Sequence, residues 1–117
     1  MGRLTTHILD TASGRPAQGV EIVLFAVLAH GNRQIAAVRT NEDGRVDGPI
    51  AEGAAFAKGE YELVFHLGAY FDALGLDLPE PKFLDTVVLR FGIAEPDQHY
   101  HVPLLVSPYG YSTYRGS

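Results

Sequence analysis

The sequence contains no cysteine, which excludes disulfide bonds, thiolate metal sites and cysteine nucleophiles. Basic residues are also scarce: nine Lys and Arg stand against fourteen Asp and Glu, giving a net charge of −5. A chain with this balance lacks the positive field that attracts phosphate groups, so nucleic acid and anionic membranes are disfavoured as partners.

Long apolar runs are absent as well. No stretch approaches the roughly 20 apolar residues of a membrane-spanning helix, and residues 1–10 contain no apolar signal core. We therefore expect a cytoplasmic protein. With 46% apolar residues in 117, the chain is long enough for one core, so we predict a single domain over residues 1–117.

Thirteen Gly and seven Pro separate short apolar runs along the chain, a rhythm typical of an all-β domain. We predict strands at residues 4–9, 20–28, 34–40, 59–67, 85–93, 99–106 and 111–115. The second run is apolar at nearly every position and is expected to be buried on both faces. Gly31 and Asn32 are expected to form the hairpin turn that follows it. About seven or eight strands at this spacing favour a two-sheet β-sandwich.

One segment departs from the strand pattern. Tyr70, Phe71 and Leu74 recur at helical spacing within residues 69–75, and the prolines that follow at 79 and 81 cannot continue a regular element. This pattern predicts one short helix in an otherwise all-β fold.

Histidines on two distant strands are the first candidates for chemistry. Alternation places His7 on one face of the first strand, with Thr5 and Leu9, and places His99 and His101 together on one face of a late strand. The two faces could meet and bring the imidazoles together. Two other interpretations remain open: each histidine lies at a solvated strand edge, or three histidines form a zinc site.

Arg45 and the carboxyl-terminal residues are further candidates. Arg45 directly follows a turn at residues 41–44, which can aim its guanidinium across a sheet, although a solvated loop arginine fits equally well. Ser112, Tyr114 and Gly116 share one face of the last predicted strand, whose hydroxyl and aromatic groups indicate a binding surface.

Four segments carry a resemblance that spans the chain in order. They are residues 4–10 (LTTHILD), 40–45 (TNEDGR), 99–105 (HYHVPLL) and the terminal 114–117 (YRGS). With them the sequence resembles the 5-hydroxyisourate hydrolases, the transthyretin-related protein family. The hormone carrier transthyretin shares that fold but lacks the two histidines, the arginine and the YRGS ending.

The resemblance implies a transthyretin-like sandwich of two four-stranded sheets with one short helix. It also implies a homotetramer with active sites in a channel at the dimer-dimer interface. His7, Arg45 and His101 match the catalytic residues of the family. The expected substrate-binding set adds residues from the carboxyl-terminal segment: Ser112, Tyr114, Arg115, Gly116 and Ser117.

The activity implied by the resemblance is the hydrolysis of 5-hydroxyisourate in uric acid degradation, without metal or cofactor. An imidazole with a pKa near 6.5 is well matched to take a proton from water, which we assign to His7 and His101 jointly. Arg45 would stabilise the negative charge that grows on the carbonyl oxygen. The alternative function is a non-catalytic small-ligand carrier of the transthyretin type.

Overall fold

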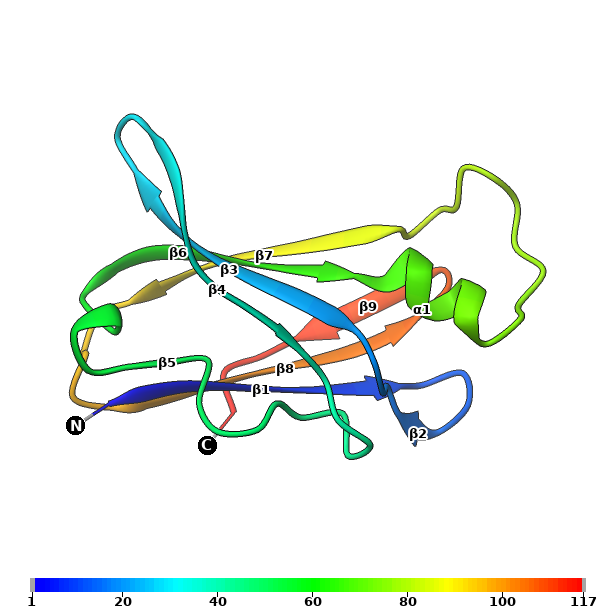
Figure 1. Cartoon of the computed structure of the whole chain (residues 1–117), viewed down its shortest axis with the longest axis horizontal. Coiled ribbons are helices and arrows are strands. Elements are labelled where there is room, and N and C mark those ends of the chain that lie inside the picture. The colour runs from blue at the N-terminus through cyan, green and yellow to red at the C-terminus, as the bar shows by residue number, and fades with distance from the viewer. Residues whose placement is uncertain (1, 117) are drawn as a thin grey trace.

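The computed structural model describes residues 2–116 as two β-sheets packed face to face (Figure 1). In the first sheet the order is β2-β1-β8-β9, and β5 pairs with the start of β1. Its strands are β1 (Arg3–Asp10), β2 (Arg15–Pro16), β5 (Ala51–Glu52), β8 (His99–Ser107) and β9 (Gly110–Thr113). The second sheet has the order β4-β3-β6-β7. Its strands are β3 (Glu21–Leu28), β4 (Gly31–Arg39), β6 (Gly59–His66) and β7 (Thr86–Ile93).

All seven predicted strands are present, so the two-sheet sandwich is confirmed. The sheets differ from the expected pair of four-stranded sheets. In the first sheet, β2 and β5 join the three predicted strands β1, β8 and β9, which makes it five-stranded. Each of these extra strands is two residues long, too short to show any alternation in the sequence.

The turn between β3 and β4 lies at residues 29–30, and Leu28 pairs directly with Gly31. The expected turn at Gly31 and Asn32 was therefore wrong. Gly31 does adopt a positive φ of 122°, but it does so as the first residue of β4. Later in the hairpin the register shifts at Leu24 and Phe25, which leaves Ile35 without a partner as a β-bulge.

The predicted helix is confirmed as α1 (Leu67–Ala73), two residues earlier than expected. It begins where β6 ends, and it buries Tyr70 and Phe71 while Leu74 stays half exposed. A single 3₁₀ turn, η1 (Gly53–Ala55), was not predicted. Within residues 2–116 no helix combines the length and the apolar character needed to cross a membrane.

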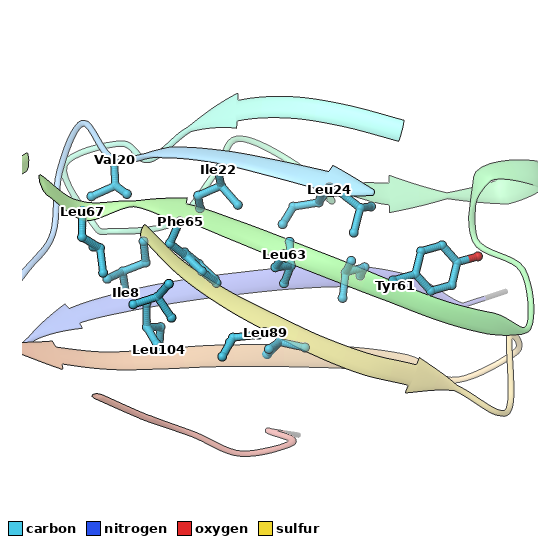
Figure 2. Packing of buried hydrophobic residues seen from close by; sticks show 14 of the residues in the cluster. Ile8, Val20, Ile22, Leu24, Tyr61, Leu63, Phe65, Leu67, Leu89 and Leu104 are labelled. Carbon is cyan, nitrogen blue, oxygen red and sulfur yellow. The ribbon is translucent and has the colours of Figure 1, made fainter. Parts of the chain in front are cut away.

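The core lies between the two sheets, as Figure 2 shows. Ile8 of β1 and Leu104 of β8 meet Leu63 and Phe65 of β6, and all four side chains are fully buried. Alternation along β6 is confirmed, since its odd-numbered residues from 61 to 65 are the buried ones. Burial on both faces of β3 holds at residues 22–24 but fails beyond, where positions 25 and 27 are only half buried.

The pairing that positions the site is the parallel one between β1 and β8 (Figure 1). Thr5 lies opposite His101, and His7 lies opposite Pro103. Because the inward residues of both strands fill the core, the alternate side chains are turned to the outer face of the sheet.

Candidate active site

Both predicted catalytic histidines lie on the outer face of the β1-β8 pair. His7 and His101 are half buried, whereas their neighbours Ile8 and Val102 belong to the core. Thr5 and His99 lie on the same face. The prediction that the two distant strands bring their imidazoles to one sheet face is confirmed.

The turn before Arg45 is built by Asn41. The backbone N–H groups of Asp43 and Arg45 donate to Asn41 Oδ1 at 2.9 and 3.2 Å, and the Asn41 N–H donates to the Arg45 carbonyl at 2.7 Å. An asparagine side chain that closes its own turn in this way fixes the backbone of the residues that follow. The backbone of Arg45 is therefore fixed by a turn that can be predicted from the sequence.

Gly44 brings this turn against β1. Its φ is +72°, and a side chain there would place a Cβ 2.5 Å from the carbonyl oxygen of Ile8. The Ile8 N–H donates to the Gly44 carbonyl at 2.9 Å, and Arg45 forms a β-bridge with His7. The glycine thus permits the close approach that sets Arg45 beside the histidine face.

The carboxyl-terminal segment crosses over His101. The Gly116 N–H donates to the His101 carbonyl at 2.7 Å, and a Cβ on Gly116 would lie 2.7 Å from His101 Cδ2. Only glycine allows the backbone to run this close to the imidazole ring. Ser117, the last residue of the predicted binding set, lies outside the described residues.

Arg115 is turned toward the core side of the segment. Its guanidinium carbon lies 3.9 Å from the ring centre of Tyr100, which is buried. The same guanidinium donates to Gln98 Oε1 at 2.9 Å and to the His99 carbonyl at 3.3 Å. Arg115 therefore anchors the segment that carries Tyr114 and Gly116, and the described chain does not place it in the hollow beside His101.

Two neighbouring hollows mark the outer face. Thr5, Arg45, His99 and His101 line the first, of about 290 Å³. The second, of about 200 Å³, is lined by residues farther along the same two strands and by Tyr114: His7, Leu9, Pro103, Leu104, Leu105 and Tyr114. His7 therefore lines a different hollow from His101 and Arg45, and Ser112 lies exposed on β9 and lines neither.

The surroundings of the two histidines favour the neutral imidazole. Partial burial lowers the pKa of His101, and the positive charge of Arg45 and the neighbouring His7 and His99 lower that pKa further. Burial and Arg45 also lower the pKa of His7, opposed by a backbone hydrogen bond with Asp43 and by the charge of the Asp43 carboxylate. Near pH 7 both rings can therefore accept a proton.

Thr5 makes a contact that the sequence did not reveal. Its hydroxyl oxygen lies 2.8 Å from His99 Nε2 and 2.8 Å from His101 Nδ1. Alternation placed Thr5 on the same face as His7, but only the β1-β8 register sets it between the two histidines of β8. Among residues 2–116, no three His, Asp or Glu side chains gather as metal ligands would.

Comparison with known proteins places this arrangement in a family. The model of the HIUase/Transthyretin family matches residues 4–116. The chain belongs to this family. A relative from Rhizobium meliloti (strain 1021), named 5-hydroxyisourate hydrolase 2, is 65% identical over 99% of this chain and 97% of its own length. A family member from Pseudomonas aeruginosa, named 5-hydroxyisourate hydrolase, is 59% identical over 100% of this chain and 93% of its own.

Solved structures show the same family fold. The 5-hydroxyisourate hydrolase of Klebsiella pneumoniae has a TM-score of 0.82 at 35% identity, with both chains covered completely. An (S)-allantoin synthase has a TM-score of 0.93 at 47% identity, and this chain spans 99% of its own length but 44% of that longer chain. Sea bream transthyretin in complex with thyroxine has a TM-score of 0.86 at 30% identity, covering 97% and 94% of the two chains. The chain is thus similar both to proteins named 5-hydroxyisourate hydrolase and to a transthyretin in complex with thyroxine.

Proposed function

We propose that this protein hydrolyses 5-hydroxyisourate to 2-oxo-4-hydroxy-4-carboxy-5-ureidoimidazoline in uric acid degradation. The observation that carries the proposal is the cluster of His7, Arg45 and His101 on one sheet face. The relatives named 5-hydroxyisourate hydrolase, at 65% and 59% identity over nearly the whole chain, support it.

The reaction opens a cyclic amide by adding water. A histidine takes a proton from water as the oxygen attacks the carbonyl carbon, and the Arg45 guanidinium stabilises the oxygen on which negative charge grows. The carbon-nitrogen bond of the ring then breaks, the ring nitrogen receives the proton that the histidine took, and the carbonyl carbon becomes a carboxylic acid that loses its proton to water. His7 and His101 together supply these proton transfers, which neutral rings near pH 7 can perform.

The carboxyl-terminal residues complete the substrate site. Tyr114 lines the hollow that contains His7, and Gly116 brings the backbone over His101. We assign substrate contacts to these two residues and to Ser112 and Ser117, while Arg115 contributes by anchoring the segment to Tyr100. A homotetramer with the sites at its dimer-dimer interface would place this set in a closed channel.

A carrier of the transthyretin type is the competing function, since a family member is known in complex with thyroxine. The experiment that separates the two follows the ultraviolet absorbance of 5-hydroxyisourate made fresh by urate oxidase. We expect the purified protein to speed the decay, and the same rate is expected after exhaustive EDTA treatment. If decay matches that in buffer and thyroxine binds, the carrier function replaces the hydrolase. A cytoplasmic location stays a prediction, which cell fractionation would test.

A further inference from the structure

The bridging hydroxyl of Thr5 couples two imidazoles. A hydroxyl group has one hydrogen to donate, and its lone pairs accept. With His99 Nε2 and His101 Nδ1 each 2.8 Å from Thr5 Oγ1, both bonds form only if at least one nitrogen carries a proton, because the single hydroxyl hydrogen can serve only one bare nitrogen. When one of these nitrogens is bare, the other must therefore carry a proton.

One arrangement of the protons on the two rings suits the hydrolysis. When the His101 proton is on Nδ1, that nitrogen donates to Thr5, and Nε2 is left bare to accept a proton from water. Thr5 then donates its own hydrogen to His99 Nε2, so His99 carries its proton on Nδ1. Each ring is held in the tautomer that a base at His101 requires.

We propose that Thr5 and His99 form a proton relay that fixes His101 as a base and carries the proton it accepts to solvent. The inference rests on the hydrolase function proposed above. When His101 Nε2 takes a proton from water, its Nδ1 proton passes to Thr5 Oγ1, and the Thr5 hydrogen passes to His99 Nε2. His101 is neutral again and the positive charge is on His99, whose Nδ1 returns one proton to water. The chain then runs in reverse as the ring opens: His101 Nε2 gives its proton to the leaving ring nitrogen, the Thr5 hydrogen passes to His101 Nδ1, and the His99 Nε2 hydrogen passes to Thr5. His99 Nδ1 takes a proton from water, which restores the starting tautomers.

Exposure and charge favour this direction. His99 is exposed to solvent, whereas Thr5 and His101 are half buried. Arg3 and Arg45 line the hollow that His99 and His101 share, and the charges of Arg45 and His7 act on the His101 ring. Around His99 the cationic groups are Arg3, which pairs with it across the strands, and Arg115, which donates to its carbonyl. A positive charge costs less free energy on the more exposed ring, because water solvates it there.

The decisive variants change one hydroxyl at a time. Thr5→Val removes the hydroxyl and keeps the shape, Thr5→Ser restores the hydroxyl, and Thr11→Val is a matched control whose hydroxyl bonds only the Val106 carbonyl at 3.2 Å. We expect Thr5→Val to lower kcat by about tenfold or more with little change in KM, because the lost group acts on proton transfer and not on binding. Thr5→Ser and Thr11→Val are expected to stay within about twofold of the parent kcat.

His99→Ala tests the exit of the proton. Without the exposed ring, buffer has to take the proton from Thr5, so kcat should fall and should rise again with the concentration of added imidazole. Nitrogen-15 chemical shifts of the two rings provide a readout that needs no turnover: the parent should show His101 protonated at Nδ1, and Thr5→Val should change both rings.

A purely structural role for Thr5 predicts different results. If Thr5→Val keeps the parent kcat, or if Thr5→Ser fails as badly as Thr5→Val, the relay is wrong. Unchanged ring shifts in Thr5→Val would overturn the tautomer coupling by themselves. If the parent protein shows no hydrolysis while its ring shifts follow the expected pattern, then the coupling stands and the proposed hydrolase function fails.

Discussion

His101 is the side chain on which most contacts of the candidate site converge. Thr5 bonds its Nδ1 atom, the Gly116 backbone crosses its ring, and the charge of Arg45 acts on it. A side chain with so many neighbours cannot swing freely, so its remaining ring nitrogen is held in one place. Such preorganisation is what a general base needs.

Replacing this imidazole should therefore reduce the turnover rate more than it reduces the stability of the fold. For His101→Gln we expect kcat/KM to fall by about 10² to 10⁴, the usual contribution of a general base, because an amide cannot take the proton from water. The absorbance assay measures the loss, and His30→Gln is the matched control, since His30 is exposed in the turn after β3. Equal activity of both variants would remove His101 from the mechanism.

The pH profile follows from the lowered pKa values of His7 and His101. A base works in its neutral form, so kcat/KM should be on its plateau near pH 7 and should decline only below about 6.5, the ordinary histidine value. Protonation in acid also favours the unfolded chain, where the pKa is not lowered, so the contribution of these groups to stability is present above 6.5 and is lost as pH falls. An activity limb centred above 6.5 would contradict the assignment.

At the scale of elements, the sequence predicted those features that depend on a pattern of only a few neighbouring residues. Alternation located seven strands, helical spacing located α1, and the turn residues before Arg45 predicted its fixed backbone. The parallel pairing of β1 with β8 joins residues more than ninety positions apart, and no local pattern encodes that register. For this reason the position of Thr5 between two histidines, and of Arg115 on Tyr100, came only from the structure.

The segment after β9 supplies a prediction about an element. In Gly116→Ala the new Cβ would lie 2.7 Å from His101 Cδ2 while the backbone is bonded to the His101 carbonyl, so the ring or the segment has to move. We expect activity to fall by about tenfold or more with almost no change in melting temperature, because this segment lies outside the core. Gly92→Ala is the control, since a Cβ at Gly92 meets open space.

At the scale of the whole molecule, the site is too open for a small substrate. Binding pockets enclose most of a ligand, about 70–90% of its surface, whereas both hollows lie on the outer face of one sheet. Tyr114, which lines the second hollow, exposes 62% of its surface. A second copy that packs on this face would cover Tyr114 and close the hollows, and two-fold symmetry would make the paired sites equivalent.

The expected dependence of activity on assembly is testable with a buried charge. An aspartate at Ser112, which lies opposite Leu105 of the second hollow, would place a carboxylate in the contact, where losing its water costs several kcal/mol or more, so the assembly should dissociate. The molar mass from light scattering and the turnover rate, measured on one sample, should fall together in Ser112→Asp, whereas Ala29→Asp, in the exposed turn after β3, should change neither. A monomer that keeps full turnover would show that one chain completes the site, and the interfacial placement of the carboxyl-terminal residues would then be wrong.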